Sequence, residues 1–164
     1  MSGHLASRLL HSVQQLGALR GTPQAIAWGF AVGIYVGFFP LVGLKTLLTL
    51  AVVSLLGGNR IAAVVGVTIH DLSLPVVPML MRVEYDLGYW LLSHPHHFPE
   101  ALVHPSAEML KHLMNWKTML TSGSPLMLGA ALLGVPVAAV SYFAMLGMVK
   151  ARQSSGRADS HPRR

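Results

Sequence analysis

The sequence contains no cysteine and few charged residues. The absence of cysteine excludes disulfides, thiolate metal sites and cysteine nucleophiles. Asp, Glu, Lys and Arg make up only 11% of the 164 residues, whereas soluble domains average about 25%. So few charges cannot cover the surface of one domain of this size, and lipid is the simplest solvent that tolerates the apolar surface that remains. The composition therefore predicts an integral membrane protein.

Signatures of catalysis are also absent. The sequence has no GxSxG motif, no P-loop and no dinucleotide fingerprint. Glu84 and Asp86 are two positions apart, so their carboxylates cannot share a helix face as a catalytic pair. We therefore expect no catalytic residue, no cofactor and no enzymatic activity.

Histidines gather in a polar connector, residues 93–124. They are His94, His96, His97 and His104. The run has no HExxH spacing and no cysteine partner, which are the usual marks of a zinc site. The flanking prolines instead predict a loop at the membrane interface, and we expect no metal site.

The net charge of +6 comes mainly from the two ends of the chain. The basic residues there are Arg8, Arg20, Lys150, Arg152, Arg157, Arg163 and Arg164. In a soluble protein such an excess would suggest a nucleic-acid partner. Beside apolar segments it instead predicts that both termini are cytoplasmic and contact anionic lipid. Cytoplasmic termini require an even number of crossings, and we expect no nucleic-acid partner.

Four apolar runs divide the predicted membrane domain, residues 23–150. They cover residues 24–39, 41–56, 61–81 and 125–148. The last run has 24 residues without a charge, more than the roughly 20 that a helix needs to cross a bilayer. The first two have 16 residues each, and the third is interrupted by polar residues and proline.

Two arrangements of residues 24–58 agree with cytoplasmic termini. The two short runs either cross the membrane fully or form a re-entrant hairpin that dips in from the cytoplasm. In both, residues 61–81 lead out and residues 125–148 return. We favour the hairpin because both arms are short and Pro40 lies at the break between them. Irregular backbone at membrane depth must be buried in protein or line a wet cavity, so the hairpin implies a second copy or a partner protein around Pro40.

The flanking segments have different characters. Residues 1–22 carry leucines and valine at helical spacing opposite polar residues, which predicts an amphipathic helix. That helix lies either in the headgroup plane or against the rest of the protein. Residues 151–164 are basic and rich in serine and arginine, and we expect them to be disordered.

Small residues repeat every four positions in the first apolar run, as Gly29, Gly33 and Gly37. This spacing places them on one helix face, where they allow two helix backbones to approach closely. The face serves either for packing or as a path for a substrate. Three further residues are candidate packing or hinge positions, namely Pro40, Gly43 and Pro75.

Polar residues inside the apolar runs are the candidates for function. Ionisable groups such as His70 and Asp71 cost several kcal/mol at membrane depth unless they are paired or hydrated. Asp71 either pairs with Lys45 or Arg60, or belongs to a polar substrate or proton site. Lys45 either forms an ion pair or extends its ammonium group to the membrane surface, or it binds a phosphate. The candidate substrate-binding residues are Lys45, Asn59, Arg60, His70, Asp71 and Ser73.

Residues 23–88 resemble the DUF2062 family of bacterial membrane proteins. The resemblance rests on a glycine-rich run ending in Pro40 and Gly43, on Thr46, on Asn59 at the end of the second run, on Pro75, and on Leu87 with Gly88. The sequence departs from the family where His70 and Asp71 replace Asn-Pro, where Ser73 replaces Thr, and where Lys45 replaces a frequent Gln.

The resemblance implies a small helical domain in the bacterial inner membrane. Some relatives carry a glycosyltransferase domain, which associates the family with envelope glycan or lipid-linked sugar metabolism. We therefore expect an all-α polytopic membrane protein with broken or re-entrant helices that binds or transports an envelope lipid or its phosphate head. The alternative is a scaffold or partner subunit that docks through its glycine face. Either protein would form a homo-oligomer or bind a membrane partner.

Overall fold

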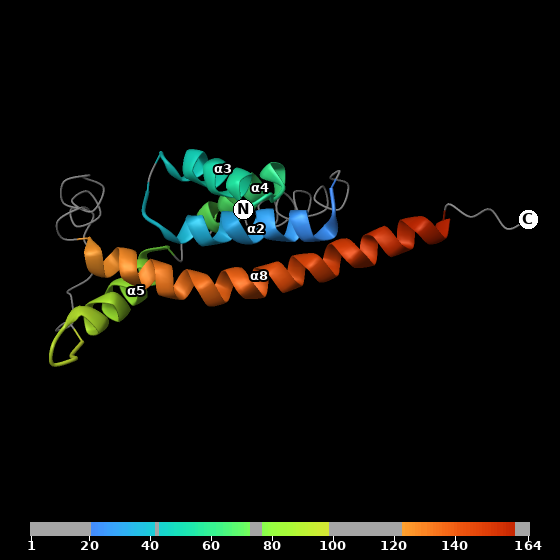
Figure 1. Ribbon diagram of the computed structural model, residues 1–164. Coiled ribbons are helices and arrows are strands. Elements are labelled where there is room, and N and C mark those ends of the chain that lie inside the picture. The colour runs from blue at the N-terminus through green and yellow to red at the C-terminus, as the bar shows by residue number, and fades with distance from the viewer. Residues whose placement is uncertain (1–20, 42, 73–76, 99–122, 160–164) are drawn as a thin grey trace, which may run out of the picture.

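The computed structural model is all-helical in the residues it describes, which are 21–41, 43–72, 77–98 and 123–159. These residues form five helices and no strand: α2 Pro23–Phe38, α3 Lys45–Leu55, α4 Arg60–Leu72, α5 Val77–Leu92 and α8 Ser124–Asp159 (Figure 1). The predicted all-α class is thus confirmed. The expected N-terminal amphipathic helix lies outside the described residues, as do Ser73, Pro75, His104 and most of the connector.

Local sequence explains where α2 begins and ends. The Thr22 side chain accepts a hydrogen bond from the backbone N–H of Ala25 at 3.2 Å, and Pro23 occupies the first turn. Both features favour a helix start. At the other end, the residue before Pro40 is extended, as the proline ring demands. Gly43, at φ +83°, then turns the chain into α3.

The turn between α3 and α4 returns the chain to the start of α2. Gly57 adopts φ +68° just after α3, a common way to end a helix. Asn59 donates its backbone N–H to the Ala25 carbonyl at 2.7 Å. The Asn59 side chain accepts from the backbone N–H of Ala62 at 3.0 Å, which caps α4. Helices α2 and α3 therefore form an antiparallel hairpin.

Helix α4 packs against α2 in the same direction, through the glycine face predicted from the sequence. A Cβ on Gly29 would overlap the Asn59 carbonyl, and a Cβ on Gly33 would overlap the Ala63 carbonyl. Gly37 lies against the His70 ring. This face is therefore filled by the chain itself.

Helix α8 runs opposite to α2. The ring centroids of Trp28 and Tyr142 are 5.4 Å apart, and Gly134 contacts Tyr35. Later residues of α2 therefore contact earlier residues of α8, so the two helices are antiparallel. The buried core lies mainly between them and includes Ile26, Phe30, Ile34, Phe38, Ala130, Met145 and Val149.

Helix α5 packs on the first part of α8, also in the opposite direction. Gly88 lies against the Pro125 carbonyl and Gly129 against the Glu84 backbone. Figure 1 shows α5 at the Ser124 end of α8, beyond the ends of α2 and α4. Helices α4 and α5 therefore run in the same sense, one after the other, opposite to α8.

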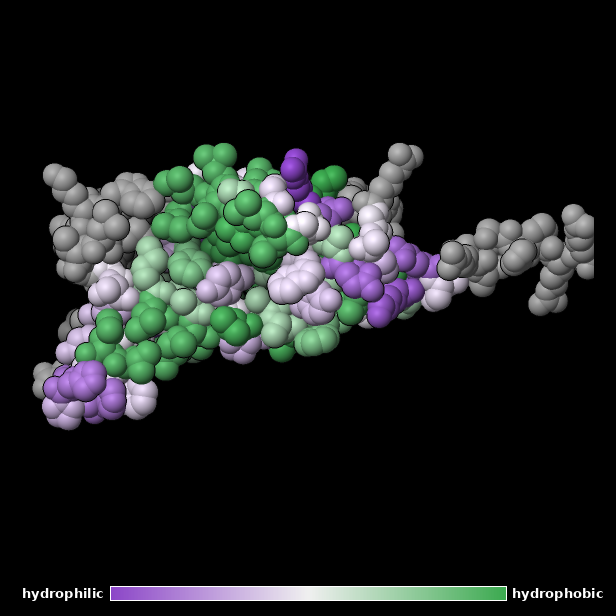
Figure 2. All heavy atoms as spheres, viewed as in Figure 1, coloured by the Kyte–Doolittle hydropathy of each residue, from purple (hydrophilic) through white to green (hydrophobic). Residues whose placement is uncertain are grey.

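The surface of α8 is largely apolar. Its exposed large side chains include Leu132, Val135, Val137, Val140, Phe143 and Met148. Among the described residues, α8 is the one helix long and apolar enough to cross a membrane, over Ser124–Ser154. Only 17% of the most apolar 18-residue stretch of α8 is buried, whereas the core helix of a soluble protein is mostly buried. Figure 2 shows hydrophobic residues over the middle of one face, with hydrophilic residues toward the Asp159 end of α8 and at the turn after α5.

The interruption predicted at the centre of the run 61–81 is present, because α4 ends at Leu72 and α5 starts at Val77. Pro75 lies between them in the sequence, and a proline disfavours helix in the residue before it. The tail expected to be disordered from residue 151 is helical to Asp159. A helix already formed over the apolar run extends easily through good helix formers such as Ala151 and Arg152.

Candidate functional site

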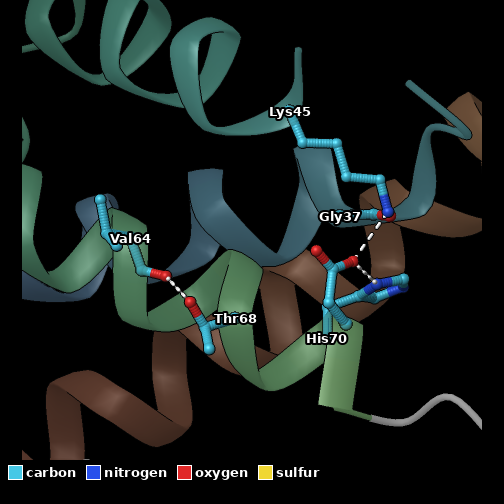
Figure 3. Close-up of polar contacts among 6 residues, drawn as sticks. Gly37, Lys45, Val64, Thr68 and His70 are labelled. Carbon is cyan, nitrogen blue, oxygen red and sulfur yellow. Dashed lines mark hydrogen bonds and ion pairs between the residues drawn. The ribbon is translucent and has the colours of Figure 1, made fainter. Parts of the chain in front are cut away.

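Three ionisable side chains gather where α2 and α4 end and α3 begins. We call Lys45, His70 and Asp71 the polar cluster. The Lys45 ammonium donates to the Asp71 carboxylate at 2.8 Å and to the Gly37 carbonyl at 2.9 Å (Figure 3). Of the partners that the sequence left open for Asp71, the structure thus selects Lys45.

The environment of Lys45 favours a cation. Gly37 supplies one of the last four carbonyls of α2, which have no partner within the helix and lie at its negative end. The Lys45 side chain is 18% exposed and the Asp71 side chain 46% exposed. The Lys45–Asp71 ion pair is therefore partly exposed, and we expect it to stabilise the fold by on the order of 1 kcal/mol.

His70 lies on α4 beside the ion pair, and its ring has no hydrogen bond. Both ring nitrogens are buried without a partner. Nδ1 is 3.7 Å from the nearer carboxylate oxygen of Asp71, too far for a hydrogen bond. The ring packs against Phe38, with centroids 4.8 Å apart. A buried polar group without a partner is uncommon in folded proteins and requires an explanation.

Glu84, on α5, is a further buried ionisable residue that the sequence did not single out as a candidate. It is 1% exposed, and its Oε2 has no hydrogen-bond partner. A usable signal was the four-residue spacing Leu80, Glu84, Gly88, which places the carboxylate on the face of α5 that packs against α8. The apolar side chains of Val83 and Trp90, on the same helix, are exposed instead.

The other candidate residues lie elsewhere. Asn59 caps α4, and Arg60 is exposed at the first residue of that helix. Ten residues of helix separate Arg60 from His70, or roughly 15 Å. The structure therefore brings Lys45, His70 and Asp71 together and leaves Asn59 and Arg60 at the opposite end of α4. Pro40 and Gly43 lie in the link from α2 to α3.

A second feature is an apolar groove of about 560 Å³ between α2, α3 and α8. It is lined by Trp28, Ala31, Val32, Tyr35, Val52, Leu56, Val135, Ala138, Ala139, Tyr142 and Phe143. None of these side chains is charged. The volume is that of a small-molecule site, which is commonly about 300–1,000 Å³.

The histidines after α5 make aromatic contacts. The His96 ring stacks on Trp90 with centroids 4.7 Å apart, and the His97 ring meets Tyr89 at 5.5 Å. Within the described part of the chain, no three His, Cys, Asp or Glu side chains are grouped so that they could hold a metal ion. Arg82 and Asp86 form an i, i+4 ion pair on α5, with Nε of Arg82 3.8 Å from Oδ2 of Asp86.

Comparisons with known proteins place the chain in a family without assigning an activity. Neither the curated proteins nor the solved structures include a significant match. One family model, described as "Uncharacterized protein conserved in bacteria", matches residues 7–157. This match extends well beyond the segment that carried the resemblance and includes Glu84 and all three residues of the polar cluster. The chain therefore belongs to the DUF2062 family of bacterial proteins.

Proposed function

We propose that this chain is an integral protein of the bacterial inner membrane that binds an envelope lipid, with an acyl chain in the apolar groove. The observation that carries the proposal is the groove itself, which has no charged lining residue. Its α8 wall, from Val135 to Phe143, lies in the middle of the 24-residue apolar run. If α8 crosses the bilayer, the groove opens at acyl-chain depth, where the abundant ligand is a lipid tail.

The helix directions support a membrane topology in which α8 crosses and α2 with α3 is a re-entrant hairpin. Helix α2 starts beside the Val149 end of α8 and stops beside Gly134, roughly 15 Å short of Ser124. It is therefore too short to cross beside α8. Helices α4 and α5 together follow the whole apolar run of α8 in the opposite direction. They supply the second crossing, broken at the polar cluster.

Broken helices that meet at membrane depth are typical of membrane binding sites, because their free ends offer polar backbone groups to a ligand. The scaffold alternative has less support. Its docking face was to be the row Gly29, Gly33 and Gly37, and α4 covers that row. A partner protein would have to dock on another surface, of which exposed α8 is the most apolar.

The groove can be tested by filling it. Ala139→Phe places a ring in the groove, and Ala144→Phe places the same ring on exposed α8 outside it. The full chain would be purified in mild detergent from bacterial membranes, and the lipid it retains would be measured by native mass spectrometry. We expect a retained lipid in the unmodified chain and in Ala144→Phe, and a several-fold loss in Ala139→Phe.

Two results would contradict lipid binding in the groove. One is an unmodified chain that retains no lipid under conditions in which it stays folded. The other is equal lipid retention in the two phenylalanine variants, which would show that the bound lipid lies on the general apolar surface.

A further inference from the structure

The apolar groove has one end near the start of α2, and exposed basic residues follow its walls there. The lining residues at this end come from all three helices, and they are Trp28, Leu56, Tyr142 and Phe143. The exposed basic residues are Arg60, after the α3 wall, and Lys150, after the α8 wall. Figure 2 shows the change from hydrophobic residues over the middle of one face to hydrophilic residues toward the Asp159 end of α8.

Lys150 continues the face of α8 that lines the groove. It follows Phe143 by two helical turns, so the two residues share a face and lie roughly 10 Å apart along the axis. Side chains of a helix lean toward its N-terminus, which directs the Lys150 side chain back toward the groove. Its neighbour Val149 is buried in the same core cluster as Ile26, near the start of α2. Lys150 is therefore placed just beyond this end of the groove.

Arg60 reaches the same end from the side of α3. It is the first residue of α4, and only the turn after α3 separates it from the lining residue Leu56. The residue before it, Asn59, packs against Gly29, which is next to the lining residue Trp28. Arg60 and Lys150 therefore lie at the same end of α2.

Acidic residues lie away from this end in the part of the chain that the structure describes. They are at the end of α4, on α5 and at the last residue of α8, and comprise Asp71, Glu84, Asp86 and Asp159. The ion pairs engage other cations, because Lys45 pairs with Asp71 and Arg82 pairs with Asp86. Arg60 and Lys150 form no ion pair with another described residue. This end of the groove is therefore complementary to an anion.

We propose that the lipid of the groove is an anionic glycerophospholipid of the cytoplasmic leaflet, and that Arg60 and Lys150 bind its phosphate-containing head. This inference rests on the proposed function, since it concerns the head of the lipid whose acyl chain fills the groove. The apolar run of α8 ends at Met148, which puts Lys150 at the level of the headgroups, and the basic end of a crossing faces the cytoplasm. A zwitterionic head carries its own ammonium group, which both basic residues repel, so the pair favours a head with a net negative charge.

The test offers the full chain two lipids that have the same acyl chains and different heads. The chain, purified in mild detergent, is mixed with equal amounts of phosphatidylglycerol and phosphatidylethanolamine, and the bound lipid is measured by native mass spectrometry. We expect the unmodified chain to retain phosphatidylglycerol in an excess on the order of 20-fold, because each basic residue near an anionic lipid contributes about five-fold in binding. Arg60→Gln and Lys150→Gln should each lower the ratio by about five-fold, and Arg60→Lys should keep it. The matched control is Arg82→Gln, which removes an equal charge from α5 and should leave the ratio unchanged.

Three results would overturn this assignment of the head. They are equal retention of the two lipids by the unmodified chain, an unchanged ratio in Arg60→Gln or Lys150→Gln, and an equal drop in Arg82→Gln. In each case the acyl-chain groove stands if Ala139→Phe still loses both lipids. An unmodified chain that stays folded and retains neither lipid would instead contradict the proposed function itself.

Discussion

Replacing Gly33 with alanine should force α2 and α4 apart, because the new Cβ would overlap a backbone carbonyl. The nearest atoms are the carbonyl of Ala63 and the backbone nitrogen of Val67, neither of which can move by changing a rotamer. Overpacking a core typically costs about 1–3 kcal/mol, and a clash with backbone belongs at the upper end. Alanine also stabilises a helix by about 1 kcal/mol relative to glycine. The net loss should therefore be about 2 kcal/mol.

Gly147→Ala is the matched control. Gly147 lies on α8 with nothing within 4 Å of an added Cβ. The same substitution there should raise stability by up to about 1 kcal/mol, since only the helix propensity changes. For a chain of this size, 1 kcal/mol shifts Tm by about 2–4 °C. Circular dichroism melts in detergent should thus show Gly33→Ala about 4–8 °C lower than the unmodified chain and Gly147→Ala slightly higher. Equal melting temperatures for the two variants would refute the close contact between α2 and α4.

Two further predictions concern the ion pair and the topology. Lys45→Met and Asp71→Asn should each destabilise the chain, and the double variant should lose less than the sum, with a coupling on the order of 1 kcal/mol in urea unfolding; strict additivity would show that the pair contributes nothing. Since the chain has no cysteine, Gly57→Cys should react with an impermeant maleimide only from the cytoplasmic face and Pro40→Cys from neither face. Reaction of Pro40→Cys from outside would show that residues 24–58 cross the membrane twice and do not form a re-entrant hairpin.

Local pattern predicted the features that depend on neighbouring residues. The charge-free run 125–148 predicted α8, because a helix of that length needs only a continuous apolar stretch. The four-residue spacing of the glycines predicted a close helix contact. The polar residues at the centre of the run 61–81 predicted the break between α4 and α5. Family membership also followed from spaced motifs within residues 23–88.

Features that depend on residues far apart in the sequence required the tertiary structure. Lys45 and Asp71 are 26 positions apart, and nothing in the local sequence favours Asp71 over a more distant carboxylate as its partner. The burial of Glu84 depends on α8 covering one face of α5, and the apolar groove depends on three helices meeting. Sequence periodicity specifies which face of a helix is apolar, but only packing specifies which helix covers that face and which charges are enclosed with it.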